Sequence, residues 1–415
     1  MGRAAGFVGA VLLLAFLMAG CDSTAPSGRV PDPGPDESAL AQSNNAFALD
    51  LYAKLREQKG NLFLSPYSIS SALAMTYAGA RGQTAAQMAK ALHFDLAPDR
   101  LHAAFSDLRA ALDATGKLAG CELAVANALW AQKDYPFLKG FLDLARTSYG
   151  AGTREVDFAN AAEAARQTIN RWTAEQTRDR IQDLIPPGEL DALTRLVLTN
   201  AIYFKGIWDS KFPARGTQDA PFTLLTGEKV EVPMMHQTGR FEYDQADGVQ
   251  VLGLPYKGTS LSMVILLPAK TDGLAGIEAA LRENKLLAWI GSPKHQEVRV
   301  FIPRFKLTAS FSLNDALKSL GMTNAFGQGA VDFSGMSGKA DLFISAVLHK
   351  AHVEVNEKGT EAAAATVVKI SVGTEMHGTR EGPVEFRADH PFLFLIRHNR
   401  SGSILFLGRV MNPKE

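Results

Sequence analysis

The sequence contains little cysteine and no excess of charge of either sign. Only Cys21 and Cys121 occur among 415 residues, which excludes a fold stapled by several disulfides. Lys plus Arg and Asp plus Glu each number 43, so the formal net charge at pH 7 is +0. This balance gives no electrostatic reason to expect nucleic acid or an anionic membrane surface as a partner. Binding must therefore rest on shape and local chemistry.

The sequence also lacks the short motifs of metal and cofactor enzymes. His349 and His352 have His-x-x-His spacing, but no His-Glu-x-x-His occurs, so we expect a structural pair and no zinc site. Residues 335–338 read Gly-Met-Ser-Gly, but Lys339 stands where a nucleophile elbow needs its last glycine. We therefore predict no catalytic residue, no metal and no cofactor. A triad assembled from distant residues is the alternative.

The first residues are typical of an export signal. Arg3 precedes an apolar run at residues 4–19, shorter than the ~20 residues of a bilayer span. Small residues then lead directly to Cys21, which resembles the lipobox of bacterial lipoproteins. We predict a signal peptide over residues 1–20, lipid attachment at Cys21, and an exported protein held at a bacterial cell envelope or surface. An ordinary secretory signal with an incidental cysteine is the alternative.

The rest of the chain divides into a tether and one domain. Residues 21–40 are rich in Pro, Gly, Ser and Asp, a composition that predicts a flexible tether. Residues 41–413 show no internal repeat and no linker, so they form one large domain. Helical periodicity, as at residues 161–184, alternates with strand-like runs such as 196–204 and 392–397. The fold class is therefore α+β.

A strand-like segment without an evident partner follows residue 357. From Thr360 to Val372 every second residue is small or apolar, and none of these is charged. One face of such a strand suits burial in a sheet. The segment begins with alanines, however, and no short turn joins it to a neighbouring strand. It is suited to enter a sheet that already exists. A short alanine-rich helix over residues 361–366 is the alternative.

Several motifs resemble those of the serpin family, in the family's order along residues 41–413. Residues 355–364 resemble the serpin hinge, and residues 386–394 fit the signature beyond the reactive loop. Further matches lie at residues 61–68, 198–208 and 347–351. The resemblance implies a serpin fold: a single domain with three β-sheets, about eight or nine helices, and an exposed reactive-centre loop at about residues 357–385.

The resemblance also implies a function, namely single-turnover inhibition of serine-type endopeptidases by a monomer. Cysteine-type proteases are left open as second targets. The protease cuts the loop and stays joined as an acyl-enzyme while the loop inserts into the central sheet, as is known for this family. Elastase-like, chymotrypsin-like and subtilisin-like enzymes are the favoured partners. The alternative is a non-inhibitory serpin that serves as a binding or carrier module, which the small, proline-free hinge disfavours. The hinge comprises Glu357, Lys358, Gly359, Thr360, Glu361, Ala362, Ala363, Ala364 and Ala365.

The resemblance further implies control residues and a reactive bond. Beneath the sheet, a hydrogen-bonded cluster of Ser65, Ser68, Asn200 and His349 would govern opening, and Trp208 would lie where insertion begins. The family's usual distance from the hinge glutamate places the reactive bond at Gly373–Thr374. Glycine is an unusual specificity residue, and the loop is longer than in familiar serpins. The positions that stay open as alternatives are Val372, Met376 and Arg380.

Overall fold

The computed structural model describes residues 2, 33–117, 120–281, 285–291, 293–327, 330–360 and 382–415. Residues 33–415 form one compact unit. The described ranges of this unit hold ten α-helices and fifteen strands, and the strands lie in two sheets. All of the predicted signal peptide except residue 2 lies outside the described residues, and so do residues 21–32 of the predicted tether, Cys21 included. Within the described ranges, no helix combines the length and the apolar character needed to cross a membrane.

The helices gather mainly in the first half of the chain. Ser65 caps one of them, because its side chain accepts a hydrogen bond from the Ser68 amide and Pro66 follows at the first helical position. The helices are α1 (Pro35–Leu55), α2 (Pro66–Tyr77), α3 (Gly82–Ala91), α4 (Pro98–Lys117), α5 (Lys139–Tyr149), α6 (Phe158–Gln176), α7 (Leu274–Leu281), α8 (Lys285–Ile290), α9 (Asn314–Ser319) and α10 (Ser334–Ser337), with 3-10 turns η1 (Ala214–Gly216) and η2 (Asn324–Phe326).

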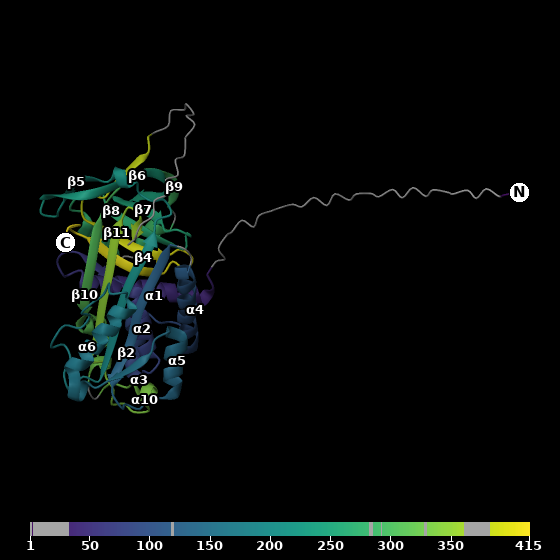
Figure 1. Ribbon diagram of the computed structural model, residues 1–415, viewed down its shortest axis with the longest axis vertical. Coiled ribbons are helices and arrows are strands. Elements are labelled where there is room, and N and C mark those ends of the chain that lie inside the picture. The colour runs from purple at the N-terminus through teal and green to yellow at the C-terminus, as the bar shows by residue number, and fades with distance from the viewer. Residues whose placement is uncertain are drawn as a thin grey trace. The chain divides into compact units, whose positions relative to one another are not determined.

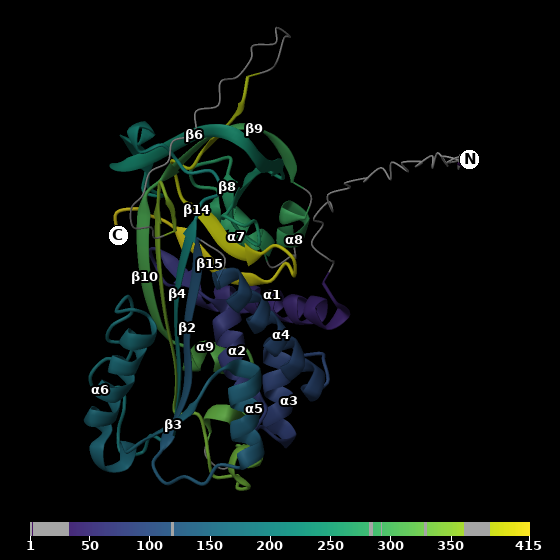
Figure 2. The same ribbon diagram turned by 45° about the vertical axis from the view of Figure 1, so that its right-hand side comes forward.

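The six-stranded sheet carries the hinge. Its strands, in spatial order, are β10 (Phe305–Ser312), β11 (Ala346–Asn356), β12 (Gly359–Thr360), β4 (Leu196–Ile207), β2 (Cys121–Gln132) and β3 (Thr153–Val156). Figure 2 shows α6 on one face of this sheet and α2 and α5 on the other. On the α6 side, a separate apolar cluster joins Phe158 and Ile169 to Trp130, Val197 and Leu348. The sheet is therefore buried on both faces where α6 covers it.

The nine-stranded sheet lies toward the end of this unit that is farthest from α3 and α10 (Figure 1). Its order is β1 (Leu62–Leu64), β15 (Ile404–Val410), β14 (Phe392–His398), β8 (Leu261–Pro268), β7 (Val249–Pro255), β6 (Lys229–Ala246), β9 (Lys294–Pro303) and β13 (Val384–Arg387), while β5 (Gln218–Thr223) pairs with β6. The sequence led us to expect three sheets, and the described residues form two. The reason is the length of β6: Met234 to Tyr243 pair with β9, and Glu242 to Ala246 pair with β7, so one strand joins both groups.

The described ranges hold ten helices, close to the expected number of about eight or nine, but two predicted boundaries are wrong. The predicted tether ran to residue 40, but α1 begins at Pro35, and Leu40 is fully buried. The predicted helix over residues 161–184 ends at Gln176, and Arg178 adopts a positive φ of 51° that a helix does not contain. Ile181 continues the helical spacing of apolar residues in the sequence. It packs into the apolar cluster beside α6, but it does so from a loop.

Candidate functional site

The hinge begins in a gap between two parallel strands of the six-stranded sheet. From Ala346 to His352, β11 pairs directly with β4, whose partners run from Val197 to Tyr203. Beyond that point the strands separate, and Gly359 and Thr360 lie between them as β12, antiparallel to both. The first residues of the predicted loop are therefore already part of the sheet.

Gly359 and Thr360 fit this gap for different reasons. Gly359 has φ +148°, and a Cβ placed on it would lie 1.9 Å from the Gly206 carbonyl oxygen, so only glycine fits without displacement. Thr360 is fully buried, and its Oγ1 lies 2.7 Å from the Tyr256 hydroxyl. Thr360 suits burial at this point because its side chain is small and its hydroxyl has a hydrogen-bond partner in Tyr256.

Trp208 covers the entrance to the gap. Its indole stacks on Tyr256 with ring centroids 4.6 Å apart and an interplanar angle of 12°. The indole Nε1 donates to the Asn356 carbonyl at 3.0 Å, and the Trp208 amide donates to the Lys358 carbonyl at 3.0 Å. Trp208 thus holds the backbone on both sides of Glu357.

The Glu357 carboxylate anchors the turn that leads into β12. It accepts hydrogen bonds from Arg304 Nε at 2.8 Å and from the Thr217 hydroxyl at 2.5 Å, and its Oε1 also contacts Arg304 Nη2. Burial by itself would raise the pKa of the Glu357 carboxyl, but the hydrogen bonds from Arg304 and Thr217 outweigh it, so this pKa lies below its usual value. The carboxylate is therefore ionised at neutral pH.

A polar cluster lies on the core side of the sheet, where β4 and β11 pair directly. His349 Nε2 accepts from the Ser65 amide at 3.1 Å, so Nδ1 must carry the proton that it donates to Asn200 Oδ1 at 2.5 Å. Asn200 Nδ2 donates to Ser68 Oγ at 2.5 Å and to Asn127 Oδ1. The Ser65 hydroxyl donates to the Leu405 carbonyl at 2.7 Å, which ties the cluster to the nine-stranded sheet.

His349 is held neutral in this cluster. It is fully buried, and burial lowers its pKa to about 3. A proton added at Nε2 would remove the acceptor of the Ser65 amide and leave a charge inside the core. The neutral tautomer is thus a structural requirement of the closed sheet.

The structure brings the predicted control residues together and adds three that sequence reasoning missed. Asn127 belongs to the polar cluster. The feature of the sequence that could have indicated this is a single amide side chain within an apolar strand. Tyr256 contacts both Trp208 and Thr360, and Arg304 binds Glu357, but neither has a local sequence signal. Their partners lie 104 and 53 residues away in sequence, so periodicity cannot reveal them.

The predicted exposed loop at residues 357–385 is shorter than expected. Glu357 and Thr360 are buried, and Val384 begins β13, which pairs with β9. The reason is backbone pairing at both ends of the segment. The remaining hinge residues, the predicted reactive bond and its alternatives lie outside the described residues: Glu361, Ala362, Ala363, Ala364, Ala365, Gly373, Thr374, Val372, Met376 and Arg380.

The histidine pair and the Gly-Met-Ser-Gly segment, neither of which we expected to be a catalytic or metal site, both lie in ordinary structural surroundings. His349 and His352 are three residues apart in β11 and so lie on opposite faces of the sheet, where they cannot share one metal ion. His352 Nδ1 lies 2.8 Å from the Thr308 hydroxyl. Ser337 ends the single-turn helix α10, and its hydroxyl donates to the Lys339 carbonyl at 3.2 Å. This is no strand-turn-helix elbow.

Comparisons with known proteins agree with this architecture. The family model described as "Serpin (serine protease inhibitor)" matches residues 42–413. The human leukocyte elastase inhibitor is 46% identical over 385 residues, which cover 90% of this chain and 99% of the relative. The solved structure of Serpin48 from the insect Tenebrio molitor has a TM-score of 0.81 at 31% identity, covering 92% of this chain and all of that one. The solved complex of human thyroxine-binding globulin has a TM-score of 0.82 at 31% identity, with the same coverage.

The family match and the relatives together cover the strands that form the gap, the hinge within it and the polar cluster beneath it. The chain therefore belongs to the serpin family of serine protease inhibitors, and it is a protease inhibitor rather than an enzyme.

Proposed function

We propose that this chain traps serine endopeptidases of the elastase type by inserting its cleaved loop between β4 and β11. The observation that carries the proposal is the position of Thr360, which is buried in the gap while the chain is uncut. Cleavage forms an acyl-enzyme on the loop, and insertion then carries the bound protease along the sheet. Each chain is consumed in one such event.

The register of β12 indicates how far insertion would proceed. Thr360 pairs with Val355 and Gly206, so in an antiparallel extension each further loop residue faces one residue lower on both strands. In this register residue 366 would separate His349 from Asn200, and residue 369 would separate Ala346 from Val197, the last pair of the two strands. Filling the gap therefore takes the loop to residue 369.

The same register assigns a face to every inserted residue. Because Thr360 points to the core at Tyr256, residues 362, 364, 366, 368 and 370 would point there too. These are Ala, Ala, Thr, Val and Ile, all uncharged, whereas Glu361 and Lys369 would point to the opposite face. The new strand replaces one β4–β11 ladder with two, so the cleaved form with the loop inserted gains backbone hydrogen bonds.

The length of the inserted strand bears on the position of the cut. A cut at Gly373–Thr374, or after Val372, leaves little chain beyond residue 369, so the acyl-linked protease is pulled close to the sheet. A cut after Arg380 leaves a longer, slack connection. We propose Gly373–Thr374 as the reactive bond, with Val372 and Met376 as alternatives that suit an elastase-like or chymotrypsin-like enzyme.

The name of the human relative, leukocyte elastase inhibitor, supports an elastase-like target. Subtilisin-like enzymes and, as second targets, cysteine-type proteases remain within the proposal.

The carrier alternative has less support. Thyroxine-binding globulin, which is named for the molecule it binds, is 31% identical to this chain, whereas the human elastase inhibitor is 46% identical over nearly its whole length. The hinge also keeps a small, buried Thr360 at the entrance of the gap. Both observations favour inhibition.

One experiment tests the function and locates the reactive bond. The soluble domain is mixed with elastase, chymotrypsin, subtilisin, trypsin and papain, and products are separated under denaturing conditions. We expect a detergent-stable complex with elastase and a released carboxy-terminal peptide that begins near residue 374. Cleavage of the chain by every enzyme, with no stable complex, would overturn the trapping mechanism. The uncleaved domain should be monomeric by light scattering.

We also propose that the chain is exported and lipid-anchored through Cys21, as a bacterial lipoprotein is. The support is the sequence around Cys21 and the composition of the residues that follow. Expression with labelled palmitate should label the full-length chain, while a Cys21→Ser variant should stay unlabelled. Cys121→Ser is the matched control and should keep the label. Equal labelling of the wild type and Cys21→Ser would contradict the anchor.

A further inference from the structure

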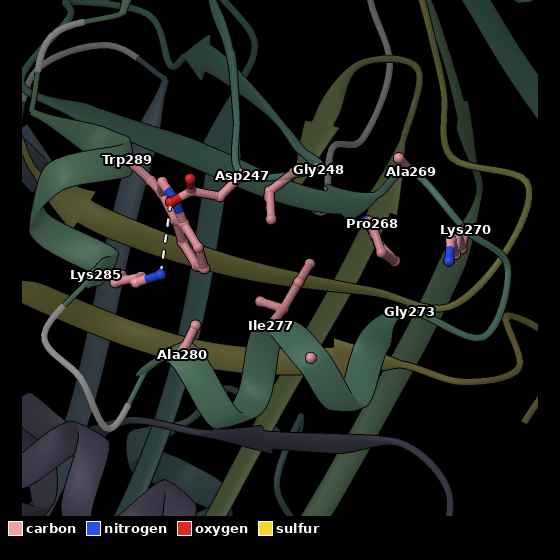
Figure 3. Close-up of a pocket in the computed structure, with 12 residues that line it drawn as sticks. Asp247, Gly248, Pro268, Ala269, Lys270, Gly273, Ile277, Ala280, Lys285 and Trp289 are labelled. Carbon is pink, nitrogen blue, oxygen red and sulfur yellow. Dashed lines mark hydrogen bonds and ion pairs between the residues drawn. The ribbon is translucent and has the colours of Figure 1, made fainter.

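A pocket of about 340 Å³ lies between α7, α8 and the ends of β7 and β8 (Figure 3). It has no residue in common with the gap between β4 and β11, with the hinge or with the polar cluster. Its apolar wall consists of Val249, Pro268, Ile277, Ala280 and Trp289. A volume in the range of about 300–1,000 Å³ and a mostly apolar wall are typical of small-molecule sites.

A tight turn and buried side chains hold part of the pocket lining in place. Asp247 and Gly248 form the two-residue turn between β6 and β7, with φ of 53° and 75°, as a tight hairpin requires. The Ala269 amide donates to the Gly248 carbonyl at 2.8 Å, which fixes the turn to the end of β8. Trp289 and Ile277 are 4% and 2% exposed, so their side chains are held by the core.

The charges of the pocket are unevenly placed. Lys285 Nζ lies 3.8 Å from Asp247 Oδ2, and Trp289 Nε1 donates to the same carboxylate oxygen at 3.4 Å. Figure 3 shows Lys285 and Lys270 at opposite ends of the pocket with Ile277 between them. Among the lining residues, Asp247 is the only carboxylate, and it offsets the charge of Lys285. At the Lys270 end no lining carboxylate offsets the charge of the lysine.

One wall of the pocket is kept clear by a glycine in a helix. Gly276 lies in α7 and lines the pocket, and a Cβ placed on it would meet no atom within 4 Å. Its φ is not positive, so the backbone does not require glycine here. Glycine weakens a helix relative to alanine. The absence of a side chain at residue 276 thus leaves space open at a cost to the helix.

We propose that this pocket binds a small amphipathic monoanion, an organic carboxylate or sulfonate with an apolar body. The anionic group contacts Lys270, and the apolar body lies along Ile277 toward Trp289. A fully apolar ligand would gain no ion pair with Lys270, and a cation would meet two lysines against one carboxylate. Asp247 limits where the anion binds, because it repels negative charge at the Lys285 end.

The test uses 8-anilino-1-naphthalenesulfonate and its uncharged analogue N-phenyl-1-naphthylamine, each titrated into the folded chain with fluorescence detection. We expect one saturable site for the sulfonate and at least tenfold weaker binding of the neutral analogue. Lys270→Gln should weaken sulfonate binding several-fold, and Asp247→Asn should strengthen it. Lys229→Gln, an exposed lysine outside the pocket, is the control and should change nothing. Equal affinity for the two probes, or unsaturable binding, would overturn the proposal.

A blocking variant tests the location. Gly276→Leu places a side chain in the open space and should weaken sulfonate binding at least tenfold. Gly140→Leu is its matched control, because Gly140 also lies in a helix and a Cβ there meets no atom within 4 Å. Unchanged binding in Gly276→Leu would place the probe elsewhere and refute the site. Thermal unfolding and formation of the protease complex report that each variant is folded, independently of probe binding.

Discussion

The two ends of the gap between β4 and β11 differ in what fills them. At the Thr360 end the strands are apart, and β12 already occupies the space. At the Ala346 end the strands pair directly over the polar cluster around His349. The Thr360 end is held by stacking and by the Glu357–Arg304 ion pair, whereas the Ala346 end is held by hydrogen bonds to a neutral imidazole. Insertion therefore starts where the sheet is open and must next break a polar cluster.

The face opposite the cluster adds a second barrier at the Ala346 end. The segment after α6 contacts β11, because Lys350 Nζ donates to the Gln182 carbonyl at 2.7 Å. The apolar cluster beneath α6 includes Val197 of β4 and Leu348 of β11. A strand that separates these two residues must displace α6 for a time. The closed sheet is thus stable at the Ala346 end and prepared for insertion at the Thr360 end.

The largest expected effect comes from a charge at the Thr360 end. Thr360→Arg places a cation in a fully buried position next to Tyr256, so the loop can no longer enter the gap. We expect cleavage by the protease to continue and the detergent-stable complex to disappear. Thr360→Ser keeps the size class and the hydroxyl, and it should keep the complex. An undiminished complex from Thr360→Arg would show that entry at this point is not needed.

The second effect acts at the Ala346 end through pH. The pKa of His349 is lowered to about 3 by burial, so between pH 6.5 and about 3 the unfolded chain binds a proton that the folded chain does not. Stability from this group is complete above pH 6.5 and falls by about 1.4 kcal/mol for each pH unit below it. His398, whose pKa is lowered to about 4, adds a similar loss.

Thermal unfolding at pH 7.5, 6.5, 5.5 and 4.5 checks this expectation. His349→Gln removes one titrating group and should give a shallower decline of the melting temperature than the wild type. His398→Gln is the matched variant outside the polar cluster around His349, and it should also flatten the decline. Only His349→Gln should change the rate of loop insertion at pH 7.5. A decline that is as steep in His349→Gln as in the wild type would rule out the role of this imidazole.

The sequence predicts some parts of the fold and of the site and misses others. The α+β class, the hinge and the residues around His349 are predictable, because they depend on local patterns and on motifs in a fixed order. The roles of Tyr256 and Arg304 are not predictable, because each contacts a hinge residue that is distant in sequence and becomes its neighbour only in the folded chain. The end of α6 is missed for a related reason: Ile181 is apolar and well spaced, but tertiary packing buries it from a loop.

A smaller effect tests the backbone at the Thr360 end. Gly359→Ala brings a Cβ within 1.9 Å of the Gly206 carbonyl oxygen at φ +148°, so β12 must shift or leave the gap. We expect a loss of roughly 1–3 kcal/mol in the free energy of unfolding, measured by denaturant titration. Gly140→Ala, at an open helical position, should not destabilise the chain. Equal stability of the two variants would mean that β12 does not depend on glycine.

The smallest effect isolates a single hydrogen bond. Tyr256→Phe removes the hydroxyl 2.7 Å from Thr360 Oγ1 while keeping the stacking on Trp208. Both partners are buried, so we expect a loss of about 1 kcal/mol in unfolding free energy. Thr360→Val removes the other partner, and in the double variant the two losses should not add, because they share one interaction. Since the bond holds β12 in the gap of the uncut chain, its loss should also make the loop more sensitive to proteolysis. Fully additive losses would indicate that the two hydroxyls act separately, and that Thr360 is held in the gap by packing and backbone pairing alone.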